Sequence, residues 1–209
     1  MSSKTSYHHG DLYSALLAAG ESVLAENGLR GFTLRECARR AGVSHAAPKH
    51  HFGDVSGFLS AIAARGYERL TERLEGELAG ATNLEEEFLA TTVAYVGFAE
   101  DYPEHFRIMF RADLIDMQSP VVTEAATGAF TVLTNVIRRQ RGKPEASRVD
   151  VFEGSAVQEV GPDILVGWSH IHGFAHLMLE DRLGNPDETT RMEMMRGSAK
   201  RLSALITSG

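Results

Sequence analysis

The sequence predicts an all-α protein in which a three-helix head precedes a larger helical bundle. Apolar residues recur at helical spacing through most of the chain, whereas the alternation of apolar and polar residues typical of strands is rare. Capping residues and prolines mark the ends of these helical segments. We therefore expect about nine helices and no sheet.

The composition is that of a folded soluble protein. The chain has 209 residues, of which 43% are apolar and 23% are charged. No apolar run approaches the ~20 residues of a membrane helix, and no apolar signal segment is visible. Cys37 is the single cysteine, which excludes an internal disulfide framework and a cysteine-rich zinc site. We expect a cytoplasmic protein without a membrane partner.

The net charge of −7 is unevenly distributed along the chain. Residues 1–60 carry 6 Lys and Arg against 5 Asp and Glu, a net charge of +1. Residues 61–209 carry 15 against 23, a net charge of −8. Because phosphate contacts are local, an acidic body does not prevent the first segment from presenting a basic face to DNA.

The first two helices have recognisable ends. An apolar stripe runs through residues 12–24, and Gly28 stops that helix. Thr33 and Glu36 match a capping box, which opens a short helix that reaches Ala41.

The next two helices follow at once. Gly42 ends the second helix, and Ser44 is expected to cap a third that reaches about Phe52. Asp54 is expected to cap a long helix over residues 55–78.

The rest of the chain is also expected to form helices, and most of them begin at or next to a proline. Proline suits the first turn of a helix because its missing N–H has no partner there. Residues 140–161 mix glycine, proline, serine and charges, and predict no clear element. The expected helices cover about residues 84–100, 104–110, 120–139, 162–183 and 186–206.

Residues 33–52 have the pattern of a helix-turn-helix. Two short amphipathic helices flank Gly42, which permits the left-handed backbone that a tight turn needs. Helix-turn-helix docking places the second helix in the major groove of DNA. The alternative is an ordinary helical hairpin with a solvated basic face. The predicted shared core consists of Leu34, Cys37, Ala38 and Val43.

The exposed residues of this motif are the candidates for DNA contact. Small side chains let the second helix approach base edges, and Lys49, His50 and His51 add donors near phosphates. Arg39 and Arg40 are also expected to stay exposed. The residues predicted to bind DNA are Thr33, Arg35, Ser44, His45, Ala46, Ala47, Lys49 and His50.

Three stretches carry a family resemblance. YHHGDL at 7–12, the helix-turn-helix with GVSHAAP, and HFGDVSGFL at 51–59 resemble the TetR family of bacterial transcriptional regulators. WSHIHG at 168–173 resembles the Trp-His-Gly signature in the C-terminal domain of one TetR subgroup. The resemblance implies an all-helical homodimer that binds double-stranded operator DNA and is released from it by a small molecule.

The resemblance implies two domains and one function. Residues 1–54 would form the DNA-binding domain, and residues 55–209 the ligand-binding and dimerisation domain. The expected function is a ligand-responsive repressor. The alternative is a helical small-molecule-binding protein that has lost DNA binding, which Val55 and the acidic total charge support. Two positions depart from the residues usual in the family. Lys49 stands where the family usually has an aromatic residue, and Val55 where it usually has lysine.

The candidate ligand site combines bulky apolar residues with one polar group. Such a combination is typical of small-molecule cavities. Trp168 and His172 lie one turn apart and share a helix stripe. We expect the cavity to be bounded by Phe106, Met109, Phe110, Trp168 and His172, with His172 as its hydrogen-bonding group.

Other polar residues do not point to catalysis or to a metal. His105, Arg107 and Arg111 are expected to face solvent. His172 and His176 have the spacing of metal ligands, but no acidic partner at a fixed spacing completes a site. No nucleophile elbow or phosphate-binding loop is present. The sequence therefore predicts no enzyme, no catalytic residue, no metal and no cofactor.

The last two helices are the expected dimer contact. Residues 162–183 carry an apolar band wider than one core contact needs. A two-fold dimer would supply the two heads that a palindromic operator requires.

Overall fold

The structure, a computed structural model, describes residues 9–150 and 155–208, and side chains within residues 12–150 and 161–207. Throughout these residues the regular elements are helices, which confirms the predicted fold class. Residues 7 and 8 of the YHHGDL motif lie outside the described residues. None of the described helices is long and apolar enough to cross a membrane.

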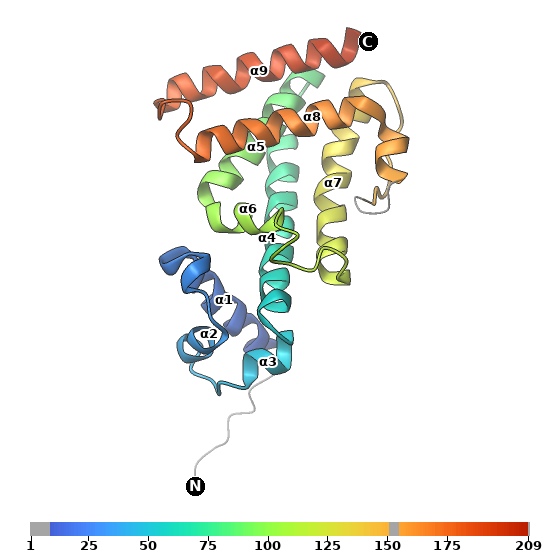
Figure 1. Ribbon diagram of the computed structural model, residues 1–209. Coiled ribbons are helices and arrows are strands. Elements are labelled where there is room, and N and C mark those ends of the chain that lie inside the picture. The colour runs from blue at the N-terminus through green and yellow to red at the C-terminus, as the bar shows by residue number, and fades with distance from the viewer. Residues whose placement is uncertain (1–8, 151–154, 209) are drawn as a thin grey trace.

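A compact head occupies one end of the molecule (Figure 1). It consists of α1 (His9–Asn27), the 3₁₀ turn η1 (Leu29–Gly31), α2 (Leu34–Arg40) and α3 (Ala47–Phe52). The long helix α4 (Val55–Leu78) leaves the head and runs through the body.

The body is a bundle built around α4. Its helices are α5 (Leu84–Asp101), α6 (Pro103–Met109), α7 (Pro120–Gln140), α8 (Ser155–Leu179) and α9 (Glu188–Ser208). In Figure 1, α4, α5 and α7 run along the long direction of the molecule, and α8 and α9 cross its far end.

The predicted starts of the long helices are confirmed where side chains cap them. The carboxylate of Asp54 accepts a hydrogen bond from the Gly57 N–H at 2.9 Å and begins α4. Asn83 accepts from the Glu86 N–H at 2.9 Å and begins α5. These bonds satisfy amide groups that have no partner inside the helix.

Two starts differ from the prediction. Helix α3 begins at Ala47, and no side chain caps it, so the capping role expected for Ser44 is wrong. The Ser44 carbonyl instead accepts from the Ala47 N–H at 3.0 Å. The last helix begins two residues after Pro186, because Asp187 accepts from the Thr190 N–H at 2.8 Å.

Helix α8 differs from the prediction at both ends. It ends at Leu179, earlier than expected. Its helical run starts at Ser155 but is interrupted at Gly161, which has φ 64° and ψ −172°. Glycine adopts this conformation without strain, and Pro162 then opens the second segment as predicted.

A continuous apolar core joins the head to the body. It includes Leu16 and Phe32 of the head, Phe58 and Leu70 of α4, and Met195 of α9. A second cluster packs α5, α7, α8 and α9 together around residues such as Phe88, Phe130, Ile164 and Leu202. Helix α4 therefore packs against both the head and the body.

Removing the cap of α4 should weaken the fold measurably. Asp54→Ala leaves the Gly57 N–H without its partner, and we expect a loss of about 1 kcal/mol in the free energy of unfolding. Urea denaturation measures this loss. Asp54→Asn is the matched control, since asparagine caps equally well. An equal loss in both variants would contradict the capping role.

Candidate DNA-binding face and ligand cavity

The helix-turn-helix has a small, well-packed core. The Thr33 hydroxyl accepts from the Glu36 N–H at 3.2 Å and starts α2. Cys37 and Ala38 are fully buried. Gly42 takes a left-handed φ of 67°, and the Val43 N–H donates to the Ala38 carbonyl at 3.0 Å. This turn sets the direction of α3 relative to α2.

Helix α3 has one anchored face and one exposed face. Pro48 is buried, and the ring of His51 lies 6.3 Å from that of Tyr13 in an edge-on arrangement. Lys49 and His50 are exposed, and the ring of His50 lies 5.4 Å from that of His51. Of the residues predicted to bind DNA, Ala47 is half-buried against the core, and the exposed ones are Thr33, Arg35, Ser44, His45, Ala46, Lys49 and His50.

The arginines of α2 are mostly engaged within the protein. Arg40 is not exposed as expected: it pairs with Glu26 at 2.8 Å and Glu36 at 3.0 Å, and only 19% of its side chain is accessible. Arg39 also binds Glu36, at 2.6 Å. Hydrogen bonds from these two guanidinium groups lower the pKa of Glu36 to about 2.

Three cations of the head keep their charge available. Among the described residues, no ion pair involves Arg30, Arg35 or Lys49. Arg35 and Lys49 come from α2 and α3, the two helices of the motif. Both were predicted to contact DNA, and their unpaired charges are available for that role.

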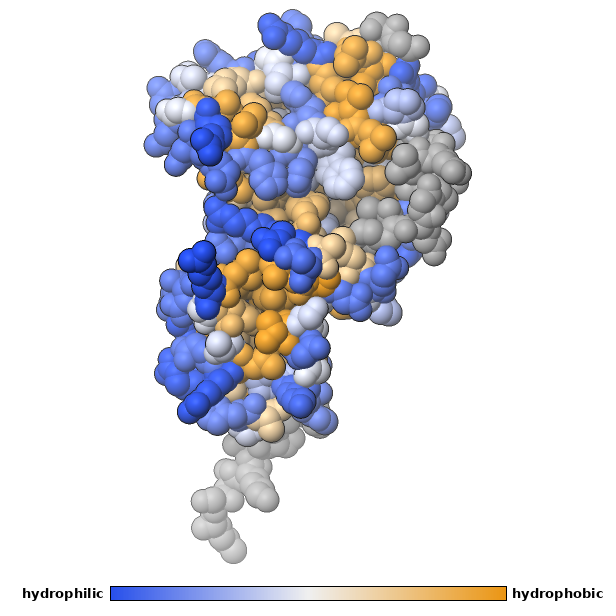
Figure 2. Space-filling model, viewed as in Figure 1, coloured by the Kyte–Doolittle hydropathy of each residue, from blue (hydrophilic) through white to orange (hydrophobic). Residues whose placement is uncertain are grey.

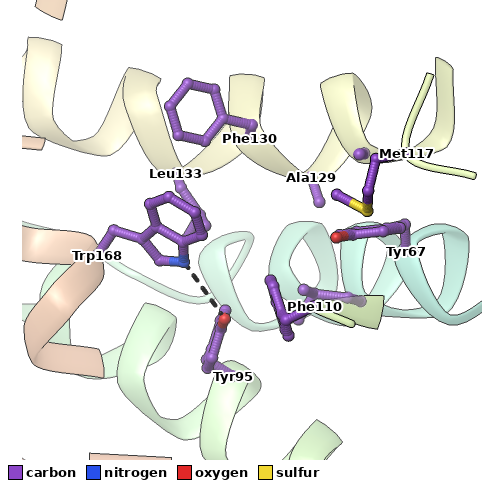
Figure 3. Close-up of a pocket in the computed structure, with 10 residues that line it drawn as sticks. Tyr67, Tyr95, Phe110, Met117, Ala129, Phe130, Leu133 and Trp168 are labelled. Atoms are coloured by element: carbon purple, nitrogen blue, oxygen red, sulfur yellow. Dashed lines mark hydrogen bonds between the residues drawn. The ribbon is translucent and has the colours of Figure 1, made fainter. Parts of the chain in front are cut away.

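A cavity of about 60 Å³ lies between α4, α5, α7 and α8. Figure 3 shows Trp168 at one end, Tyr67 and Met117 at the other, and Phe110 near Tyr95 along one side. The lining is apolar and rich in aromatic rings: Tyr67, Leu70, Tyr95, Phe110, Met117, Ala126, Ala129, Phe130, Leu133 and Trp168.

Two of the five residues expected at this site line the cavity. Phe110 and Trp168 do so, whereas Phe106 and Met109 are fully buried outside the lining. His172 also lies outside it, where its ring packs 5.3 Å from that of Phe106. The structure therefore places His172 behind Tyr95 rather than at the cavity surface.

A chain of hydrogen bonds joins the residues of the WSHIHG stretch to α5. The Tyr95 hydroxyl lies 2.8 Å from Nδ1 of His172 and accepts from Nε1 of Trp168 at 3.4 Å. Burial and the neighbouring His176 lower the pKa of His172 to about 4. Burial also raises the pKa of Tyr95. Both partners of the hydrogen bond between Tyr95 and His172 are therefore uncharged near pH 7, an imidazole and a phenol.

Sequence reasoning missed most of the lining, because α4, α5 and α7 contribute it without a motif. Tyr67, Tyr95 and Phe130 sit at ordinary core positions of separate helices. Tyr67 donates to the Met109 carbonyl at 2.8 Å, a contact across 42 residues of sequence. Nothing local in the sequence indicates such a contact.

The expectation that His105 faces solvent is wrong. Its side chain is buried, and Nε2 lies 3.0 Å from Glu21 and 2.9 Å from Arg69. Arg107 and Arg111 do face solvent, where they pair with Glu104 and Asp113. Within the described residues, no group of three His, Cys, Asp or Glu side chains could hold a metal ion.

A helix-turn-helix head with exposed cations, joined to a helical body with an apolar cavity, defines a DNA-binding regulator. Residues 16–62 match the family model of bacterial regulatory proteins of the tetR family. Residues 88–196, just over half of the chain, match the tetracyclin repressor-like C-terminal domain. The chain belongs to the TetR family of transcriptional regulators, which are DNA-binding proteins rather than enzymes.

Solved structures of other proteins share this fold. A protein of unknown function from Rhodococcus sp. RHA1 has a similar structure, with a TM-score of 0.72, 29% identity, and coverage of 99% of this chain and 98% of that one. The TetR family regulator PfmR from Thermus thermophilus shares the fold at a TM-score of 0.57 and 19% identity, over 93% and 97% of the two chains.

A sequence relative is similar over a shorter stretch. The HTH-type transcriptional regulator CymR from Pseudomonas putida is 41% identical over 64 residues, which cover 31% of this chain. The match spans about a third of the length of CymR (32%).

The half-buried His172 should make stability depend on pH. Its pKa is about 4 in the folded protein and 6.5 in the unfolded chain, so only the unfolded chain gains this proton as the pH falls from 6.5 toward 4. The free energy of unfolding should fall over this window, by at most about 1.4 kcal/mol per pH unit for one proton.

Thermal or urea unfolding at several pH values measures this effect. In His172→Gln, the decrease should become shallower. His45→Gln is the control, since His45 is exposed in the head. If the wild type and His172→Gln lose stability in parallel, the neutral, half-buried imidazole is not the cause.

Proposed function

We propose that this chain is a ligand-responsive repressor that binds palindromic operator DNA as a homodimer. One observation carries the proposal: the cavity and the head share α4. Tyr67 and Leu70 of this helix line the cavity. Nearer the head, the ring of Phe58 packs 5.4 Å from Phe32 and 4.1 Å from Phe52.

The mechanism is a shift between two arrangements of the dimer. In one arrangement the two α3 helices fit successive major grooves, about 34 Å apart. A small molecule that prefers the other arrangement lowers DNA affinity by the difference in its affinity for the two. Because α4 touches both sites, its displacement changes the position of the head.

Residues 1–54 form the DNA-binding domain and residues 55–209 the ligand-binding and dimerisation domain in this proposal. Helix α4 begins at their boundary. The protein acts in the cytoplasm, where operator DNA is accessible. We also propose that the chain belongs to the Trp-His-Gly subgroup, a proposal supported by the hydrogen bonds that Trp168 and His172 both make with Tyr95.

The dimer contact is proposed on the outer face of α8 and α9. An apolar patch covers this end of the body in Figure 2. Val166 and Leu205 are 40% and 61% exposed there. A groove of about 570 Å³ runs between the two helices, and its lining includes Val166, His170, Phe174, Met194 and Leu202.

One observation favours the alternative of a ligand-binding protein without operator affinity. Val55, at the start of α4, is 42% exposed and brings no charge to the DNA side of the head. The N-terminus of α4 still offers amide groups to a phosphate. A salt-dependent shift of palindromic promoter DNA separates the two functions, and no shift at low salt would favour the alternative.

Lys49→Ala should weaken binding to specific and unrelated DNA alike. Its exposed ammonium meets a phosphate, so the slope of log affinity against log salt should fall by about one unit per half-site. Ala46→Leu should instead reduce specific binding more strongly, because it blocks close approach. Lys143→Ala, in the body, is the control. An unchanged slope in Lys49→Ala would exclude the phosphate role.

Val166→Glu should weaken the dimer at least tenfold, because a charge placed in an apolar contact loses its hydration without gaining a partner. Light scattering at micromolar concentration measures the effect. Val121→Glu is the matched control, since Val121 is 44% exposed at the start of α7. A wild-type protein that is monomeric under these conditions would contradict the proposed dimer.

A further inference from the structure

The chemistry of the cavity wall restricts what can occupy it. Five of the lining side chains are aromatic, and the others are aliphatic or methionine. The ring of Trp168 lies 5.9 Å from Phe130 at an interplanar angle of 72° and 6.4 Å from Phe110 at 48°. Tyr67 and Phe110 meet edge to face at 6.0 Å. Rings inclined in this way offer both faces and edges to a flat aromatic guest.

The polar atoms at the wall are already committed. The Tyr67 hydroxyl donates a hydrogen bond to the Met109 carbonyl. The Tyr95 hydroxyl bonds to His172 and accepts from Trp168. None of the lining residues is Asp, Glu, Lys, Arg or His. A carboxylate or ammonium group would therefore lose its hydration without a counter-charge, which is strongly unfavourable.

The group that bonds to Tyr95 from behind the wall does not supply a charge either. His172 lies 2.8 Å from the Tyr95 hydroxyl, and its low pKa keeps it neutral near pH 7. Tyr67 and Tyr95 themselves have pKa values raised by burial, so they remain uncharged phenols.

The cavity is smaller than a single aromatic ring needs, so a lining side chain must move before one ring can enter, and a larger guest would need still more displacement. An apolar cavity of about 150 Å³ holds benzene, whereas this cavity has about 60 Å³. Trp168 and Leu133 also border a second void of about 20 Å³ on the other side. The bond from Trp168 to Tyr95 is long, at 3.4 Å, so the indole can move at small cost.

Movement of Trp168 would act on α8. Val166 precedes Trp168 by two residues and His170 follows it by two, and both line the groove on the outer face. A guest that displaces the indole therefore pushes on the helix that carries the proposed dimer contact. A ring-sized molecule could in this way change the dimer contact and with it the relative position of the two heads.

We infer that the effector of this cavity is an uncharged molecule built on a single aromatic ring, seated among Tyr67, Phe110 and Trp168. The regulatory role of this molecule rests on the proposed function, whereas its binding to the cavity does not depend on DNA. The inference assigns a chemical class and distinguishes that class from organic acids and amines of the same size.

Trp168 is the single tryptophan of the chain and lines the cavity, so tryptophan fluorescence reports on changes beside it. Toluene and benzoate are matched probes that share a ring and differ in charge. We expect toluene to change the fluorescence saturably, and benzoate to bind at least 100-fold more weakly, because each tenfold step costs about 1.4 kcal/mol and an unpaired buried charge costs more than two such steps. Methylcyclohexane should bind several-fold more weakly than toluene.

Variants test the location of the bound molecule. Ala129→Leu fills the cavity and should abolish the response to toluene. Ala79→Leu is the matched control at the exposed end of α4 and should retain it. If Ala129→Leu does not fold, Met117→Phe places a large side chain at a partly exposed part of the lining and makes the same test.

Benzoate that binds as well as toluene would overturn the inference, as would a wild-type protein that binds neither. A parallel DNA-release assay separates this outcome from failure of the repressor function. Toluene that binds without releasing DNA would support the assigned chemistry and contradict the repressor mechanism. DNA release by benzoate, with no response to toluene, would do the reverse.

Discussion

The burial of α4 along most of its length holds the molecule together. At its start, the apolar face of this helix packs into the head through Phe58, and ten or so residues later Tyr67 and Leu70 border the cavity. Interiors are close-packed and transmit displacement rather than absorb it. A change at the cavity is therefore carried along one rigid element to the DNA-binding end.

A polar contact lies beside this apolar one and fixes the angle between head and body. Glu21 of α1 accepts hydrogen bonds from Arg69 of α4 and lies 3.0 Å from His105 of α6. Although burial acts to raise it, these contacts lower the pKa of Glu21. The Arg69 guanidinium also stacks 4.9 Å above the ring of Tyr102. Three helices thus meet at the Glu21 carboxylate. A purely apolar contact would let these helices slide against one another.

Local signals in the sequence predicted the fold well because they act over a few residues. The cap at Asp54 and the proline at the start of α7 mark helix ends through bonds that neighbouring residues make or lack. The start of α3 was missed for the complementary reason. Ala46 occupies the cap position there and has no side chain that could signal it.

The site was less predictable because its contacts are distant in sequence. His105 is buried against Glu21, which lies 84 residues away in the sequence. Arg40 pairs with Glu26 of α1. Phe110 and Trp168 were predicted from their bulk, whereas Tyr95 looks like any core residue until the fold places it between Trp168 and His172. Periodicity identifies a buried face but does not say which buried faces enclose a void.

The position of Cys37 determines how the head responds to oxidants. Its side chain has no exposed surface, and burial raises the pKa of the thiol to about 11. At pH 7 roughly one molecule in ten thousand would carry the thiolate, the form that oxidants and alkylating reagents attack. The helix-turn-helix therefore keeps a cysteine in its core as a small apolar group, and this thiol should react slowly with oxidants.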